Sequence, residues 1–380
     1  MPMDMIYFDN AATTRPIEAA VNAAVSAMTG EGFGNPSSLH KLGLNASQTV
    51  SAARKTIAAS IGALPEEIFF TSGATEADNT AVFGAAASLG KRKKKIVITS
   101  VEHPAVAEPV RQLEMQGFEV VRVSPREGKY FAEDIAEAVC KDTCLVSCMA
   151  VNNETGAVLP VADAFSRIKK LYPDTLTHCD AVQCYMKLPV KVKNLNADLI
   201  SLSGHKVHAP KGIGALYVRK GVHISSLIYG GGQEKAFRSG TESVPLIAAF
   251  GAAVGELYKT LDERYQHVSD LSKLLRSKAA AKGIIVNSPE DGSPYVNSIA
   301  VEGLRSEVLL HFLEQKGIYV SSGSACSKGK KSSVLTEFGV PDKLADFTIR
   351  VSFCAENTAE EVEKFLVALA EARNILQKVK

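Results

Sequence analysis

Short apolar runs alternate with longer amphipathic segments through the first two thirds of the chain. Most of these runs are rich in β-branched residues, and several are apolar at both odd and even positions; they read EIFFTSG, KIVITS, FEVVRVS, CLVSCMAV, LTHCDAV, DLISLSG and GALYVR. Apolar residues at both parities are typical of strands that are covered on both faces. Helical patterns lie between the runs, for example over residues 74–90 and 104–117. The alternation predicts an α/β fold with a mainly parallel sheet and helices on both faces.

The pattern changes after about Gly240. One long helix is predicted from about Val244 to Lys282. Strand patterns follow at GIIV and NSIAVE, then a helix at SEVLLHFLEQKG, a strand at TIRVSF and an amphipathic helix that begins near Thr358. This second pattern predicts a smaller α+β domain. We therefore expect a large domain over residues 15–255 and a small domain formed by residues 1–14 and 256–380.

Composition and charge argue against several classes of protein. The chain has 380 residues, of which 46% are hydrophobic and 22% are charged, and its net charge is +2. So weak a charge favours neither nucleic acid nor an acidic membrane as a direct partner. The first residues lack the basic and apolar regions of a signal peptide. No apolar run approaches the roughly 20 residues of a membrane span. The seven cysteines are scattered along the chain. We therefore predict a cytoplasmic protein with free thiols.

A phosphate site is indicated where the first of these strands ends. In a parallel sheet with helices on both faces, ligands bind at the carboxyl ends of the strands. Ser72 and Gly73 follow EIFFT and lead into a helix pattern that begins with Ala74 and Thr75. The free N–H groups of a helix start, together with the Thr75 hydroxyl, suit a phosphate. The alternative interpretation is an ordinary capped helix start without a ligand.

An acidic residue follows another predicted strand. Asp180 comes directly after LTHC, and Gln183 lies three residues later. A carboxylate in this position suits a metal ion, a ribose or a protonated ring nitrogen. A zinc site that includes His178 and Cys179 is disfavoured, because neighbouring residues of a strand point to opposite faces. Three further cysteines lie in or just before an apolar run and are predicted to be core thiols; they are Cys140, Cys144 and Cys148.

A lysine follows the apolar run DLISLSG. Lys206 comes directly after His205 and before a turn rich in proline and glycine. A partly desolvated lysine has a lowered pKa, and its free amine can condense with a carbonyl group. The alternative is a surface lysine in a turn. A phosphate site, an acid for a protonated nitrogen and an amine for an aldehyde are together what pyridoxal phosphate requires.

One cysteine stands in an unusual setting for a structural thiol. Cys326 lies within YVSSGSACSKGKKSSVL, among serines, glycines and lysines, whereas a buried structural cysteine usually has apolar neighbours. Cationic neighbours lower the pKa of a thiol and so favour the nucleophilic thiolate; here they are Lys328, Lys330 and Lys331. Serine and glycine keep a backbone adaptable. We therefore expect a reactive thiol on a segment that can move.

Long motifs are spread along nearly the whole chain. They read YFDNAATT, GNPSSLH, TSGATEADN, EHPAV, VNNETG, HCDAVQ, SGHKVHAPKGIG, GGGQEKAFRSGTE, SSGSAC and IRVSF, in that order. In order and spacing they resemble the cysteine desulfurases of the NifS/IscS type. The resemblance implies a fold-type I, class-V aminotransferase-like enzyme that uses pyridoxal 5'-phosphate and is built on a seven-stranded sheet. It also implies a homodimer that takes sulfur from L-cysteine and leaves L-alanine.

The resemblance further implies roles for the residues that match these motifs. Lys206 would bind the cofactor covalently and remove the α-proton of the substrate, and Cys326 would attack the substrate sulfur and become a persulfide. Arg350, helped by Asn35, would bind the substrate carboxylate, since a guanidinium can fork onto two oxygens. The residues implied around the cofactor are Ala74, Thr75, Ser203 and His205 at the phosphate, Thr241 from the partner subunit, and His103, Asn153, Asp180 and Gln183 at the ring.

Several alternatives stay open. His103 is implied to stack on the ring and to take part in catalysis, but a helix cap or a core position is the simpler interpretation of its pattern alone. The sulfur acceptor is an iron–sulfur scaffold or a tRNA-thiolation enzyme: the cysteine segment is more basic than in the members best known for iron–sulfur assembly, and the chain ends soon after its last helix. No intrinsic metal site is expected, although Cys326 could transiently ligate a cluster on an acceptor. The rival functions are a selenocysteine lyase, an aminotransferase of the same fold and a non-enzymatic, thiol-based carrier of sulfur or metal.

Overall fold

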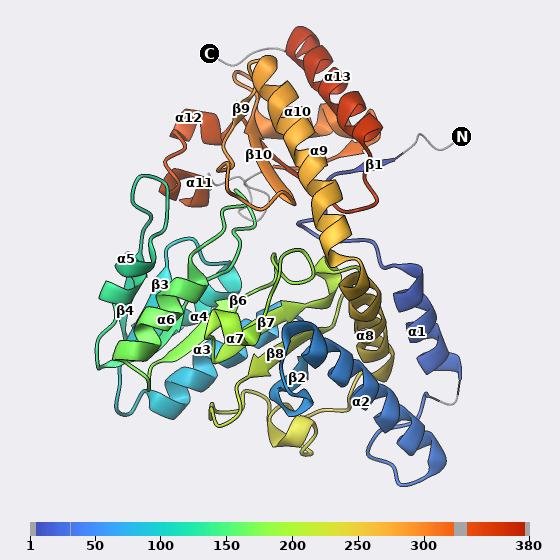
Figure 1. Cartoon of the computed structure of the whole chain (residues 1–380), viewed down its shortest axis with the longest axis vertical. Coiled ribbons are helices and arrows are strands. Elements are labelled where there is room, and N and C mark those ends of the chain that lie inside the picture. The colour runs from blue at the N-terminus through green and yellow to red at the C-terminus, as the bar shows by residue number, and fades with distance from the viewer. Residues whose placement is uncertain (1–4, 31, 323–332, 377–380) are drawn as a thin grey trace.

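The computed structural model describes residues 5–30, 32–322 and 333–376. Two units are visible in Figure 1, a larger one with a seven-stranded sheet and a smaller one above it; helices α8 (Val244–Lys259) and α9 (Leu261–Ala281) pass from one to the other. Each unit has its own hydrophobic core. The division at residues 15 and 255 remains a prediction.

The large sheet has the strand order β2-β8-β7-β6-β5-β3-β4. Neighbouring strands are parallel, except that β8 is antiparallel to β2 and β7. The strands are β2 (Ile68–Thr71), β3 (Lys95–Thr99), β4 (Glu119–Val123), β5 (Thr143–Ser147), β6 (Leu176–Asp180), β7 (Leu199–Ser203) and β8 (Gly214–Val218). Every residue of β5, β6, β7 and β8 is buried, which explains why these runs are apolar at both parities. The prediction of a mainly parallel, seven-stranded sheet is confirmed.

Helices cover both faces of this sheet, as the alternating pattern predicts. Residues of β3 pack alternately to the two sides: Ile96 and Ile98 share a core cluster with α3 and α4, whereas Val97 belongs to the main core with α2, α6 and α8. The helices that precede α8 are α1 (Glu18–Thr29), α2 (Lys41–Ile61), α3 (Ala74–Leu89), α4 (Pro104–Met115), α5 (Ala132–Glu137), α6 (Val161–Leu171) and α7 (Val192–Leu195).

The smaller unit is built on a four-stranded antiparallel sheet in the order β12-β13-β10-β9. Phe8 packs edge-to-face against Phe353 and Phe365 in its core, with ring centroids 5.1 and 5.7 Å apart. Its strands are β9 (Ile285–Val286), β10 (Val296–Ala300), β12 (Ser321–Ser322) and β13 (Thr348–Ser352), and its further helices are α10 (Ser306–Glu314), α11 (Ser333–Glu337), α12 (Asp342–Ala345) and α13 (Ala359–Ile375). Thr358 caps α13, close to the start that the pattern predicts.

The N-terminal segment contacts both units. β1 (Ile6–Tyr7) pairs in parallel with β11 (Ile318–Tyr319) of the smaller unit. Next, the Ala11 N–H donates to Ser352 Oγ at 2.8 Å. Thr14 then donates its backbone N–H to the His205 carbonyl, in the larger unit, at 2.9 Å. Residues 6–14 therefore run between the two units.

The prediction of one long helix from Val244 to Lys282 is wrong. Two helices, α8 and α9, meet at Thr260 with a bend of 75°. Thr260 has φ −118° and ψ 22°, outside the helical region. Lys259 ends α8 and acidic residues fill the first turn of α9, so the charges at the break favour a helix end and a new start. Among the described helices, none alone is long and apolar enough to cross a membrane, and this bent pair meets that condition only when taken together.

Candidate active site

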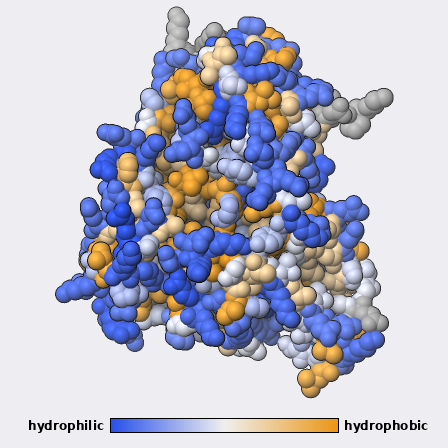
Figure 2. Space-filling view, in the orientation of Figure 1, coloured by the Kyte–Doolittle hydropathy of each residue, from blue (hydrophilic) through white to orange (hydrophobic). Residues whose placement is uncertain are grey.

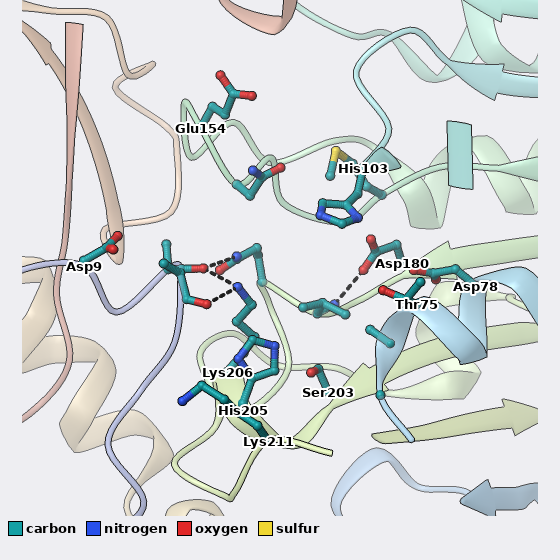
Figure 3. Close-up of a pocket in the computed structure, with 18 of the residues that line it drawn as sticks. Asp9, Thr75, Asp78, His103, Glu154, Asp180, Ser203, His205, Lys206 and Lys211 are labelled. Atoms are coloured by element: carbon teal, nitrogen blue, oxygen red, sulfur yellow. Dashed lines mark hydrogen bonds between the residues drawn. The ribbon is translucent and has the colours of Figure 1, made fainter. Parts of the chain in front are cut away.

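A cavity of about 600 Å³ lies between the two units, where the central strands of the large sheet end (Figure 3). Its walls come from the N-terminal segment, from the residues that follow β2, β6 and β7, from the start of α4 and from the smaller unit. In Figure 3, His103 stands across the cavity from Lys206, and Asp180 and Thr75 lie to the same side of both. The residues predicted from the sequence that line the cavity are Ala74, Thr75, His103, Asn153, Asp180, Gln183, Ser203, His205, Lys206 and Arg350.

Lys206 projects into this cavity from a tight turn after β7. Its Nζ donates to the carbonyl oxygens of Ala11, at 2.6 Å, and Ala12, at 2.7 Å. The turn depends on Gly204, because a Cβ there would lie 2.7 Å from Ile213 Cγ2. The two carbonyls of the N-terminal segment thus hold the lysine amine in place, and Lys206 is positioned by residues nearly 200 positions away in sequence.

Asp180 ends strand β6 and is buried. One of its oxygens accepts a hydrogen bond from the Val182 N–H at 2.9 Å. Burial raises the pKa of Asp180 well above its usual range, and the neighbouring carboxyl of Asp78 adds to the rise. A carboxylate in such a place stays ionised only beside a cation. A protonated ring nitrogen in the cavity would be that cation.

Asp78, on helix α3, was not predicted as a site residue. It is completely buried and lines the cavity, and neither of its oxygens accepts a hydrogen bond from the part of the chain that the structure describes. The Nε2 atom of His178 lies 3.5 Å from Asp78 Oδ1. The ring of His178 is also held by the Oγ atoms of Ser147 and Ser201, at 2.9 and 3.0 Å. A second carboxyl group therefore stands beside Asp180 and increases the demand for a cation.

The cavity also offers hydrogen-bond donors. Helix α3 begins at Ala74, so the N–H groups of Ala74 and Thr75 have no partner within the helix. The Ser203 hydroxyl is buried without a hydrogen-bond partner among the described residues. Burial, and then the charges of Lys206 and Lys211, lower the pKa of His205 to about 4. A neutral ring, a hydroxyl and two helix N–H groups are donors that suit a phosphate.

His103 fits both interpretations of its pattern. It is the N-cap of α4, and its Nδ1 accepts a hydrogen bond from the Ala105 N–H at 3.1 Å. Its ring also lines the cavity. Burial lowers the pKa of His103, so the ring is neutral near pH 7 and its face is available to a flat aromatic ligand.

Arg350 enters the cavity from strand β13. Its guanidinium donates to the Asn153 carbonyl at 3.0 Å and to Asp9 Oδ1 at 2.9 Å. Its Nε is buried and makes no hydrogen bond to the described residues. The Arg350 side chain thus has donor capacity left for a carboxylate. Asp9 was not predicted from the sequence; the motif YFDNAATT that contains it was its only signal.

Three predicted residues do not line this cavity in the described chain. Asn35 lies between α1 and α2, where its side-chain oxygen accepts from the Ser37 N–H at 3.0 Å. Thr241 lines a separate cavity of about 220 Å³, together with Glu234. Cys326 lies outside the described residues, but Ser321 and Ser322 line the main cavity shortly before it in sequence.

Pyridoxal phosphate fits the groups that line the cavity. Buried acidic groups need a cation, a buried donor needs an anion, and an amine lies in the same cavity. These three demands match the ring nitrogen, the phosphate and the aldehyde of this cofactor. Across the described residues, no group of three or more histidine, cysteine, aspartate or glutamate side chains is arranged to hold a metal ion.

Comparison with known proteins agrees with this reading of the cavity. Residues 6–365 match the family model of the class-V aminotransferases. A NifS/IcsS protein homolog of Lactobacillus delbrueckii is 40% identical over 99% of both chains, and the cysteine desulfurase IscS of Methanosarcina thermophila is 38% identical over 99% of this chain and 93% of that protein. The solved structure of a NifS-like protein superimposes with a TM-score of 0.93 at 38% identity, over 98% of this chain and 100% of that one. The chain therefore belongs to the class-V aminotransferase family, among relatives of the NifS and IscS type.

Proposed function

We propose that this chain is a pyridoxal 5'-phosphate-dependent cysteine desulfurase, which converts L-cysteine to L-alanine and keeps the sulfur as a persulfide on Cys326. One observation carries the proposal. An amine, a buried acid, hydrogen-bond donors and an arginine line one cavity, and the segment that bears Cys326 continues from Ser322 in its wall. The activity in the names of the relatives, from Methanosarcina thermophila and Dictyoglomus turgidum among others, supports the same reaction.

The residues around the cavity would have different roles in the reaction of the amino acid. Arg350 would bind the substrate carboxylate through two N–H groups and so fix which bond of the α-carbon faces Lys206. The amine of Lys206, held near the Ala11 and Ala12 carbonyls, would take the proton from that carbon. When bound, the cofactor supplies an electron sink for the α-carbon. Asp180 would keep the proton on its ring nitrogen.

The sulfur step needs no outside oxidant. The Cys326 thiolate would attack the substrate sulfur; a sulfur–sulfur bond forms, the carbon–sulfur bond breaks, and its electron pair stays with the carbon. That carbon, the β-carbon, then takes up a proton, and the proton that Lys206 removed returns to the α-carbon, so that the carbon skeleton leaves as alanine. Cys326 is four residues beyond Ser322, and four extended residues span at most about 14 Å. This reach supports a meeting between the thiol and a substrate in the cavity.

A protein-bound persulfide is a donor of sulfur to a second protein. The proposed acceptors are an iron–sulfur scaffold or a tRNA-thiolation enzyme, and the proposed compartment is the cytoplasm. Relatives named IscS support a part in sulfur donation. A selenocysteine lyase would use the same cavity, and the measurements below separate it from a desulfurase.

A homodimer is part of the proposal. Large apolar side chains are exposed between α1 and α2, where Phe33 is 64% exposed and Leu39 completely, and in the first turn of α2, where Leu44 is 55% exposed. Figure 2 shows apolar atoms at the tip of the lower projection, where Figure 1 places this segment. Asn35 lies in the same segment, and neither Asn35 nor Thr241 lines the cavity of its own chain. A partner subunit would cover the apolar tip and could bring these two residues to a cavity.

Two variants test the reaction. Lys206→Ala removes the amine that would hold the cofactor, so we expect loss of the visible cofactor absorbance and a fall in alanine formation of about 10³-fold or more. Cys326→Ser keeps the amine and the cavity, so the visible band should remain while alanine formation from L-cysteine is lost. Alanine by amino-acid analysis and sulfide released by a thiol are measured for both.

The other outcomes identify the rival functions. Unchanged alanine formation in Cys326→Ser would favour an aminotransferase-like reaction. If the same variant loses activity on L-cysteine but still releases selenide from selenocysteine, a selenocysteine lyase is favoured. A wild-type protein that shows no visible band after incubation with pyridoxal phosphate would favour a non-enzymatic carrier.

A further inference from the structure

A second lysine lies buried directly behind the cavity. Lys187 is 6% exposed, and its Nζ donates to Gln183 Oε1 at 3.0 Å. It does not line the main cavity, and the proposed reaction gives it no part. Its Nζ lies 6.0 Å from the centroid of the Tyr295 ring, which belongs to the smaller unit. A lysine that is almost entirely buried is costly to keep unless it has a specific partner.

The partner of Lys187 is the side-chain amide of Gln183, which does line the cavity. The two ends of a glutamine amide differ, since the oxygen only accepts hydrogen bonds and the nitrogen only donates them. Protonated Lys187 also only donates, so its ammonium group requires the oxygen of Gln183 to face it. At the other end, Gln183 Nε2 donates to the Ala11 carbonyl at 2.9 Å. Two contacts on opposite sides thus select the same orientation of the amide.

We propose that Lys187 is a positioning residue that fixes the Gln183 amide with its N–H group, rather than its carbonyl, toward the cofactor. The inference rests on the proposed function, since it concerns how the cavity presents a donor to bound pyridoxal phosphate. The Gln183 nitrogen has two N–H groups and one is engaged by Ala11. The second is left for the oxygen on the cofactor ring. A flipped amide would place a carbonyl against that oxygen and repel it.

The surroundings of Lys187 are crowded with other ionisable groups. Burial, and then the charge of Lys206, lower the pKa of Lys187 to about 7. The groups that face it from the packed elements are Cys184, Lys206, His208, Arg264, Tyr295, Arg350 and Cys354. Lys187 could therefore also act on the cofactor through its charge alone. The test has to separate that effect from the orientation of Gln183.

The pH midpoint of the visible cofactor band is the measurement. A hydrogen bond donated to the oxygen of the cofactor ring stabilises the anionic form of that oxygen. The oxygen then holds less tightly the proton that gives the visible band, so the midpoint is lower. Lys187→Met, which is close to lysine in length and volume, removes one restraint on Gln183. We expect the midpoint to rise by about 0.5–1 pH unit. The matched control is Lys193→Met at the exposed lysine of α7, which should leave the midpoint unchanged.

A double-mutant cycle completes the test. In a Gln183→Ala background, Lys187→Met should move the midpoint by less than about 0.3 unit, because there is no amide left to orient. The same shift with and without Gln183 would overturn the inference and assign the effect to charge. An unchanged midpoint in folded Lys187→Met would also overturn it. Arginine still only donates, so the midpoint of Lys187→Arg should stay within about 0.3 pH unit of the wild-type midpoint.

The controls separate this inference from the proposed function. The wild type must first show a visible band that Lys206→Ala abolishes. If no band forms, the proposed function fails and the inference falls with it. If the band forms and the cycle gives no coupling between Lys187 and Gln183, the proposed function stands and the inference alone fails.

Discussion

Glu102 is buried directly before His103, and one of its oxygens accepts no hydrogen bond from the described residues. The other oxygen accepts from Thr99 Oγ1 at 2.5 Å and from the Met149 N–H at 2.8 Å. Burial outweighs these bonds and raises the pKa of Glu102 from 4.5 to about 7. Between these two values, the folded chain holds a proton that the unfolded chain has released. The free energy of unfolding therefore falls as the pH rises through this window.

Glu102→Gln removes this titration and keeps an oxygen for Thr99 and Met149. Relative to the variant, the wild type should lose about 2–3 kcal/mol of its free energy of unfolding between about pH 5 and pH 8. Urea unfolding of both proteins at the two pH values measures the change. Glu302→Gln, at an exposed position, is the control and should show no such difference. If the free energies of unfolding of Glu102→Gln and the wild type differ by the same amount at both pH values, the raised pKa of Glu102 is contradicted.

The cavity-lining residues that follow strands were predictable from the sequence, whereas those that depend on tertiary contacts were not. Asp180 and Lys206 were predictable because each comes directly after an apolar run, at an edge where ligands bind. Asp78 lies among the buried positions of α3, beside Ala77 and Ala81, and a charge in such a stripe was a visible signal. Its neighbour His178 is 100 residues away, so the sequence could not indicate what the charge faces.

The segment after Ile228 contains a turn in a rare backbone conformation. Glu234, Lys235 and Ala236 have φ values of 48°, 57° and 63°, in the left-handed region that costs a residue with a side chain about 1–2 kcal/mol. Glu234 anchors the turn: its carboxylate is bound by both terminal nitrogens of Arg54, at 2.8 and 2.5 Å, and by the Phe70 N–H at 2.9 Å. Phe70 belongs to β2, the edge strand of the large sheet. The pair therefore ties the turn, and Thr241 beyond it, to the sheet.

Arg54→Met should leave Glu234 buried without its cation. We expect a loss of about 3 kcal/mol in the free energy of unfolding, measured by urea unfolding near neutral pH. The control is Arg122→Met, which breaks a forked pair with Glu114 that has the same chemistry but is exposed; its loss should stay below about 1 kcal/mol. Similar losses of unfolding free energy in the two variants would show that burial of the Arg54–Glu234 pair adds nothing to stability.

The joint between α8 and α9 shows the limit of prediction at the level of elements. Helical patterns run through residues 244–282, so periodicity alone joins the two helices into one. The break depends on the backbone of Thr260 and on the change of partner, since α8 packs in the large core and α9 in the small one. Elements with a uniform environment, such as the buried strands, were predicted close to their observed bounds because burial and pattern agree there.

At the scale of the whole molecule, the exposed apolar tip between α1 and α2 predicts association. Leu39→Asp places a charge on this tip, where Leu39 is completely exposed. We expect the sedimentation mass to fall from that of two chains toward that of one, since a charge at the centre of an apolar contact opposes association. Leu171→Asp, at another exposed leucine, should leave the mass unchanged. A wild type that sediments as one chain at micromolar concentration would refute the dimer.

The class of the fold could be predicted from the order of the elements, but the way in which the two units join could not. Alternating strands and helices led to the large sheet, and the change of pattern after Gly240 led to a second unit. The cavity between them depends on the path of residues 6–14. Nothing in that short segment indicates that the carbonyls of Ala11 and Ala12 meet Lys206, because backbone carbonyls are common to every residue.

The position of this first segment has a consequence for synthesis in the cell. Its partners in the small unit, β11 and Ser352, leave a ribosome more than 300 residues after the segment itself. The segment cannot be held in its place until these partners have been synthesised, because contacts so distant along the chain close late. A nascent or prematurely ended chain would carry the Lys206 amine in an unfinished setting. We therefore expect the vitamin-derived aldehyde to be captured only after Ser352 has been synthesised, and not as soon as Lys206 emerges from the ribosome.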